Sequence, residues 1–161
     1  MMFPGKWKVV GYQATKGFYI GESEMKQDGA KLTETKSVQF LNSDEKLSQT
    51  GSVDMFGGFM LRTQYTNDKG TKQRGTYNAL KNGTIIEGDW SEVTNLGISA
   101  EETYYKVQSK RPEIILVAGK EVKKGTTAEL QIYGMNLSKL TTNDITLPGR
   151  NGCKEREARI C

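Results

Sequence analysis

The chain has 161 residues with 18 glycines, three prolines, a formal net charge of +4, no histidine and two cysteines. Without histidine, serine and cysteine nucleophiles lack their usual base, and zinc, copper and haem iron lack a common ligand. We therefore expect no catalytic, cofactor or metal site, and no enzyme activity of the chain by itself. The excess positive charge lies after residue 107 without interleaved aromatic residues, and no apolar run approaches the roughly 20 residues of a membrane span, so we expect neither a nucleic-acid nor a membrane partner.

Strand-like segments follow one another at intervals of about a dozen residues, separated by turn residues. Asp28-Gly29 and Asn82-Gly83 are dipeptides that supply the positive φ of tight hairpins, and Gly57-Gly58 and Asn67–Gly70 mark further turns. The predicted strands are 6–14, 18–27, 31–41, 47–56, 59–66, 71–80, 84–93 and 99–107.

Eight strands joined by short hairpins predict an all-β fold, an eight-stranded antiparallel up-and-down β-barrel of the lipocalin or streptavidin kind. Short connections argue against a Greek-key sandwich, which needs a long return connection. Closure removes the sheet edges, and glycines within the strands suit the bends at barrel corners. The alternation places Trp7 with Val9, and Trp90 with Ile86, on one face of their strands, so we expect both tryptophans to point inward.

The character of the sequence changes near Arg111. A strand after Pro112, a turn at 123–125, a second strand through Tyr133, a turn at 134–136 and a short strand at 144–147 are similar to the start of an immunoglobulin-like sandwich. A complete sandwich takes about 100 residues. We therefore expect a barrel at 1–108 and a truncated immunoglobulin-like segment at 109–161, with a tail whose Cys153 and Cys161 are either disulfide-bonded or free.

Two sets of residues are candidates for a functional site. Trp7, Trp90 and Tyr104 would line a hydrophobic cup if the barrel holds a ligand, whereas in the alternative interpretation they only fill the core. Glu87 and Asp89 share one face of their strand, as paired catalytic carboxylates do, but Ile86 and Trp90 lie on the other face of the same strand. We expect these two carboxylates to face water.

The order of the segments resembles the haem-carrying α subunit of quinohemoprotein amine dehydrogenases. The matching stretches are "GKWKVVGYQATKGFYIGE", "GSVDMFGGFMLRTQ" and "NGTIIEGDWSE" for its lipocalin-like second domain, and "ILVAGKEVKKGTTAELQIYGMNL" for the start of its immunoglobulin-like third domain. The Gly5-Lys6-Trp7 opening is also similar to the glycine-x-tryptophan start of lipocalin-like and avidin-like barrels. The family's haem and quinone residues have no counterpart in this sequence.

The resemblance implies a non-catalytic structural module, a piece of an oxidoreductase subunit, in the periplasm. No signal peptide is recognisable in the chain. The implied partners are other domains or subunits of an amine dehydrogenase-like complex, or a second copy bound through the incomplete 109–161 segment. The alternative is a stand-alone lipocalin-like protein that binds a small hydrophobic ligand.

Overall fold

The structure is a computed structural model of the chain. It describes residues 3–56, 59–67, 70, 72–79, 83–92, 100–108, 110–119 and 130–141, and of these 53–56, 59–67, 72–79, 91–92 and 139 by their backbone. Contacts divide the chain into two units, Met1–Val107 and Gln108–Cys161, which we describe separately. The boundary expected from the sequence, between residues 108 and 109, lies one residue later in the chain.

Eight strands of the first unit follow the predicted hairpin pattern closely, because turn glycines and alternating side chains fix where each strand ends. Each strand pairs antiparallel with the next one along the chain. The strands are β1 (Gly5–Gln13), β2 (Gly17–Asp28), β3 (Lys31–Phe40), β4 (Lys46–Phe56), β5 (Phe59–Asn67), β6 (Lys72–Ala79), β7 (Ile85–Glu92) and β8 (Ala100–Lys106).

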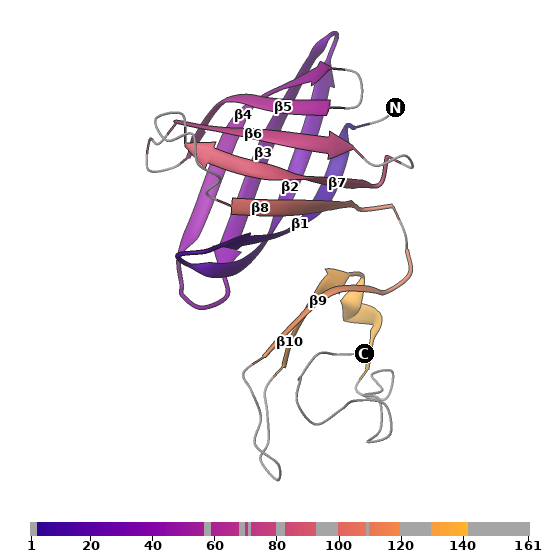
Figure 1. Cartoon of the computed structure of the whole chain (residues 1–161). Coiled ribbons are helices and arrows are strands. Elements are labelled where there is room, and N and C mark those ends of the chain that lie inside the picture. Colours follow the sequence, from indigo (N-terminus) through magenta and orange to yellow (C-terminus); the bar gives the residue numbers. More distant parts are fainter. Residues whose placement is uncertain are drawn as a thin grey trace. The chain divides into compact units, whose positions relative to one another are not determined.

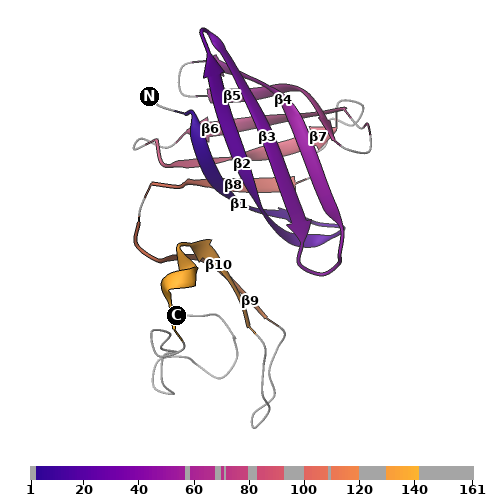
Figure 2. The same cartoon turned by 180° about the vertical axis from the view of Figure 1, so that it is seen from behind.

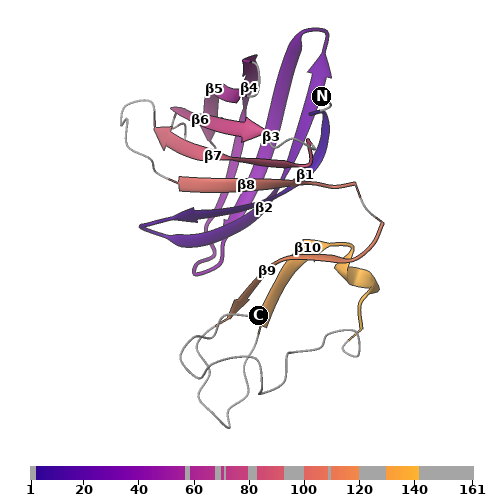
Figure 3. The ribbon, with the colours of Figure 1, turned by 45° about the vertical axis from the view of Figure 1, so that its right-hand side comes forward.

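The first and last of these strands also pair with each other. β1 lies antiparallel to β8, with Val9 opposite Tyr104 and Gly11 opposite Glu102, so the strands form a closed barrel in chain order (Figure 1). The join between β8 and β1 is visible from another direction in Figure 3. The prediction of an eight-stranded antiparallel barrel is confirmed for this unit, and closure leaves neither β1 nor β8 with an unpaired edge.

The core of the first unit lies inside the barrel. Along β3, which runs between β2 and β4 (Figure 2), every second residue is buried, from Leu32 to Phe40. Trp7 and Trp90 are both buried, as predicted, and so are Val9 and Ile86. Each large apolar side chain that is buried in this way stabilises the fold by roughly 1.5–3 kcal/mol.

One glycine makes room for a central aromatic ring. Gly11 of β1 lies opposite Tyr19 of β2, and a Cβ atom added at Gly11 would lie only 2.2 Å from Cζ of Tyr19. The ring cannot easily move aside, because its other neighbour is Phe40, with ring centroids 5.2 Å apart. Gly11 therefore allows the Tyr19 ring to lie against the backbone of β1 inside the barrel.

The second unit contains two strands within its described residues. β9 (Glu113–Gly119) and β10 (Leu130–Met135) form an antiparallel sheet, followed by a 3-10 helix at Leu137–Lys139. The strand predicted after Pro112 is thus confirmed. The turn predicted at 134–136 is wrong at its first two residues, which belong to β10; the left-handed residue is Asn136, with φ 55°.

The reason for this error is a close approach of two backbones. The register of β9 and β10 shifts between Tyr133 and Gly134, and a Cβ at Gly134 would lie 2.0 Å from the carbonyl oxygen of Glu113. Glycine is needed there for a β-bulge rather than for a turn. The two strands alone do not show an immunoglobulin-like sandwich.

Several sequence predictions lie wholly or partly outside the described residues. They are the turns at 57–58, 67–70, 81–83 and 123–125, the strand at 144–147, the two cysteines and the tail. Within the described ranges, no helix has the length and apolar character needed to span a membrane.

We predict that Gly11→Ala destabilises the protein by about 1–3 kcal/mol, because the new methyl group meets the Tyr19 ring. In a Tyr19→Ala background the same substitution should have a much smaller effect. Urea unfolding of the four proteins measures the coupling. Equal losses in both backgrounds would mean that the ring does not depend on the glycine.

Candidate functional site

The interior wall of the barrel is mainly aromatic and aliphatic. Trp7 and Tyr104 are completely buried, and the Trp7 indole donates a hydrogen bond from Nε1 to the carbonyl oxygen of Phe3 at 3.1 Å. Trp90 is also buried, so the structure brings all three predicted ligand-contacting residues to the interior. Their burial fits core filling and ligand contact equally well.

A charged pair lies within this aromatic surrounding. Lys36 of β3 and Glu102 of β8 form an ion pair with Nζ–Oε1 distance of 2.6 Å, and their side chains are only 2% and 1% exposed. These strands are not neighbours in the sheet, since β3 pairs with β2 and β4. The ion pair therefore crosses the interior of the barrel.

Three aromatic side chains also donate hydrogen bonds to the Glu102 carboxylate. Tyr19 donates its hydroxyl to Oε1 at 2.7 Å, the oxygen that Lys36 also contacts. Trp90 donates from Nε1 to Oε2, which also accepts from the Tyr104 hydroxyl at 2.9 Å. A carboxylate has about four acceptor positions, and among the described side chains four donors are directed at this one. We call these five residues, Tyr19, Lys36, Trp90, Glu102 and Tyr104, the Glu102 cluster.

Aromatic faces stabilise the cation of the pair as well. Nζ of Lys36 lies 4.0 Å from the centroid of the Trp90 ring and 5.8 Å from that of Tyr104. Both distances are within the range of cation–π attraction, which is stronger for a desolvated cation. The cluster thus replaces the water that both charged groups lose on burial.

The cluster changes the acidity of two of its members. Burial by itself raises the pKa of Glu102, but the nearby Lys36 cation and the hydrogen bonds outweigh burial and lower it. Burial raises the pKa of the Tyr19 phenol far above its ordinary value, and the negative charge of Glu102 adds to this effect. Glu102 is therefore an anion, and Tyr19 a neutral donor, at neutral pH.

A second polar group lies next to the cluster. Ser23 of β2 donates its hydroxyl to the buried carboxylate of Glu34, and Gln49 of β4, opposite Lys36, is buried too. Among the described side chains, polar residues therefore occupy inward positions on β2, β3, β4 and β8.

None of these buried polar residues was predicted from the sequence to lie inside the barrel. A signal was present in "KLTETKSVQF", where strict alternation puts Glu34 and Lys36 on the same face as Leu32, Val38 and Phe40. The same holds for Glu102 between Ala100 and Tyr104 in β8. Charged residues usually face water, so a prediction from the sequence does not expect these three to point into the barrel.

The other candidate residues lie on the outer face. Glu87 is exposed and Asp89 half-buried, as expected for residues that alternate with Ile86 and Trp90. Tyr12 and Phe18 are 43% and 47% exposed, with ring centroids 5.0 Å apart. A hollow of about 370 Å³ lies beside them; its lining residues are Val10, Gly11, Tyr12, Phe18, Glu87, Gly88, Asp89, Glu101, Glu102 and Thr103.

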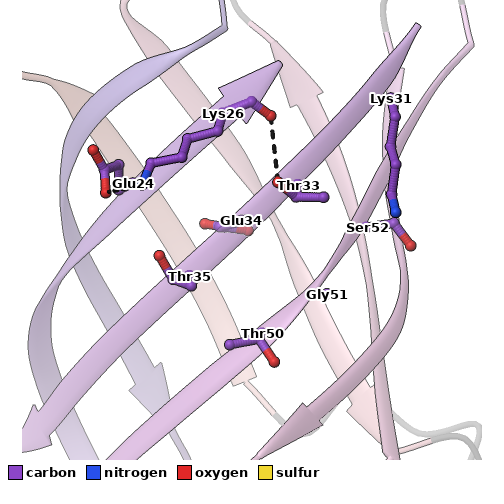
Figure 4. Close-up of a pocket in the computed structure, with 9 residues that line it drawn as sticks. All are labelled: Glu24, Lys26, Lys31, Thr33, Glu34, Thr35, Thr50, Gly51 and Ser52. Carbon is purple, nitrogen blue, oxygen red and sulfur yellow. Dashed lines mark hydrogen bonds and ion pairs between the residues drawn. The ribbon is translucent and has the colours of Figure 1, made fainter. Parts of the chain in front are cut away.

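A second hollow, of about 380 Å³, lies over β2, β3 and β4 (Figure 4). Its lining residues are Glu24, Lys26, Lys31, Thr33, Glu34, Thr35, Thr50, Gly51 and Ser52. Thr33 donates a hydrogen bond to the carbonyl oxygen of Lys26 at 3.5 Å, and Lys26 and Glu24 form an ion pair. Most of these side chains alternate with buried ones, so this hollow belongs to the solvated outer surface.

No family model and no protein of curated function matches the chain. Solved structures of designed proteins do: a redesigned β-barrel (15% identity, TM-score 0.54, covering 66% of this chain and 92% of that one) and a de novo fluorescence-activating β-barrel (15%, 0.52, 65% and 93%). A third, a redesigned barrel bound to DFHBI, has 11% identity and a TM-score of 0.55, covering 65% and 94%.

These similarities concern the fold. At such low identity they place the first unit among small antiparallel β-barrels and say nothing about what it binds. Among the described residues, no group of three or more Cys, Asp and Glu is arranged to hold a metal ion. The Glu102 cluster is the most unusual chemical feature of the described interior, because buried charges are rare unless paired.

We predict that Lys36→Met and Glu102→Gln each lower the free energy of unfolding by about 3–5 kcal/mol, because each leaves a buried charge without its partner. The double variant should be more stable than either single variant. Chemical denaturation provides the measurement. The matched control is the outer pair Lys8–Glu22, at a distance of 2.5 Å, where the same substitutions should change stability by less than about 1 kcal/mol.

A pH dependence follows from the lowered pKa of Glu102. The stabilisation from its ionised form is present above the ordinary carboxyl value of 4.5 and is lost as the pH falls through the lower pKa of the folded state. The slope of stability against pH in this acid range should decrease by up to about 1.4 kcal/mol per pH unit in Glu102→Gln. Glu101→Gln, on the outer face of the same strand, is the control. An unchanged slope in Glu102→Gln would show that other groups cause the acid sensitivity.

Proposed function

We propose that the first unit acts as a stand-alone lipocalin-like barrel that binds a small, mostly apolar ligand inside, in contact with Trp7, Trp90 and Tyr104. The observation that carries the proposal is the ion pair of Lys36 and Glu102 inside the barrel. A buried ion pair is weak support for stability, since an apolar replacement of the same shape is often as stable or more stable.

Ligand sites in proteins are mostly apolar cavities with a few well-placed polar groups that orient the ligand. The Glu102 cluster has this composition: one cation, one anion and three aromatic side chains with polar atoms. An eight-stranded barrel is also just wide enough to hold one small molecule. Three solved structures with a similar fold, two of them redesigned barrels, are described as bound to DFHBI, which agrees with this proposal without extending their ligand to this chain.

The second candidate is the non-catalytic module of an amine dehydrogenase-like complex. The order of the two units, a barrel followed by a small antiparallel sheet, favours it. Filled inward positions at Trp7, Val9 and Phe40 also suit a barrel that serves only as a scaffold. The periplasmic location and the partner domains or subunits are predictions that belong to this second candidate.

A neutral dye separates the two candidates. We predict that the full chain binds Nile red at one saturable site and that binding quenches tryptophan emission by energy transfer. Trp90→Phe and Tyr104→Phe should weaken binding about tenfold, the equivalent of 1.4 kcal/mol. Fluorescence titration gives the affinities.

The exposed aromatic pair of Tyr12 and Phe18 supplies the control for this titration. Phe18→Leu should leave the affinity unchanged, because Phe18 lies on the outer face. Binding that depends on Phe18 and not on Trp90 would place the dye outside the barrel. The absence of saturable binding would favour the scaffold.

A further inference from the structure

The Glu102 cluster contains a primary amine in surroundings unlike those of a surface lysine. Nζ of Lys36 is buried, lies 2.6 Å from Oε1 of Glu102, and faces the Trp90 ring at 4.0 Å. A surface amine has water around it even where it pairs with a carboxylate, as Lys8 does with Glu22. Lys36 has a fixed acceptor, and its surroundings exclude water.

The charges of the pair restrict what can bind beside it. Lys36 and Glu102 pair with each other, so an ionic ligand that displaced either of them would leave a buried charge without its partner. Burying such a charge is strongly unfavourable. A neutral ligand avoids this penalty. A reaction that converts the cation of the pair into another cation avoids it too.

Condensation of an amine with an aldehyde is such a reaction. We propose that Lys36 reversibly forms an imine with a neutral aromatic or polyene aldehyde bound in the barrel, and that Glu102 is the counter-ion of the resulting iminium. This inference rests on the proposed function and specifies its ligand class. Lysines that are shielded from water in apolar surroundings serve as Schiff-base nucleophiles in proteins.

The proposed reaction balances without any other reagent. The Lys36 ammonium gives a proton to Glu102, and the free amine attacks the carbonyl carbon, forming a C–N bond. A proton moves from nitrogen to the former carbonyl oxygen, giving a carbinolamine. Glu102 returns its proton to this hydroxyl, the C–O bond breaks, and water leaves. An ammonium and an aldehyde become an iminium and water, and Glu102 ends as a carboxylate.

The cluster would stabilise the product as it stabilises the ammonium. The iminium keeps one positive charge beside Glu102 and near the Trp90 and Tyr104 rings, at the position where Nζ is now. Hydrolysis of the imine needs water at the same carbon, and a closed interior limits this access. An adduct at Lys36 should therefore outlive adducts on surface lysines.

The test uses the full chain and 4-(dimethylamino)cinnamaldehyde, a neutral aromatic aldehyde that changes colour when its imine is protonated. After incubation, free aldehyde is removed by gel filtration, and borohydride then reduces the remaining imine to a stable amine. Peptide mapping by mass spectrometry locates the label. We expect roughly tenfold more label on Lys36 than on exposed Lys46, together with a red-shifted absorption band before reduction.

Matched variants keep the result interpretable. Lys36→Arg preserves the cation but cannot condense, and it should abolish both the band and the label, whereas Lys46→Arg should change neither. Glu102→Gln removes the proton acceptor and should slow formation of the adduct roughly 100-fold. Far-UV circular dichroism checks that each variant is folded.

The outcomes separate this inference from the proposed function. Equal labelling of all lysines, or a band that persists in Lys36→Arg, would overturn the imine. If Nile red still binds in that case, the interior binding function stands and only the covalent step fails. If neither dye nor aldehyde binds, both fail.

Discussion

The Glu102 carboxylate is the constraint on which the interior of the first unit depends. It accepts hydrogen bonds from β2, β3, β7 and its own strand, and the donor on β3 carries a charge. An anion that has lost its water needs all of these partners, because an unmatched buried charge is costly. The cluster therefore fixes the relative positions of strands that are distant in the sheet.

The surrounding side chains can be understood as adaptations to this carboxylate. Gly11 lacks a side chain where the Tyr19 ring lies, and this position brings the Tyr19 hydroxyl to Glu102. Trp90 has two roles, since its indole N–H donates to Glu102 while its face lies near the Lys36 cation. Trp90 and Tyr104, which the sequence predicts to fill the core or to contact a ligand, are therefore also hydrogen-bond donors to Glu102.

The contrast between the two faces of the barrel bears on function. The hollow over β2, β3 and β4 is lined largely by charged and hydroxyl side chains next to solvent, where ion pairs contribute little. The inner cluster holds one charged pair away from water, where electrostatic interactions are stronger. This difference in surroundings is the reason for proposing a reaction of an amine and a carboxylate in the interior rather than on the outer face.

The sequence by itself determined the eight strands, their hairpin order and the inward direction of Trp7 and Trp90. These features depend on turn glycines and a two-residue period, which are local. It also placed Glu34, Lys36 and Glu102 on inward faces, although that pattern is easily overlooked. Only the tertiary structure decided that Lys36 meets Glu102. The two residues are 66 positions apart on strands that do not pair, so closure of the barrel alone brings their charges together.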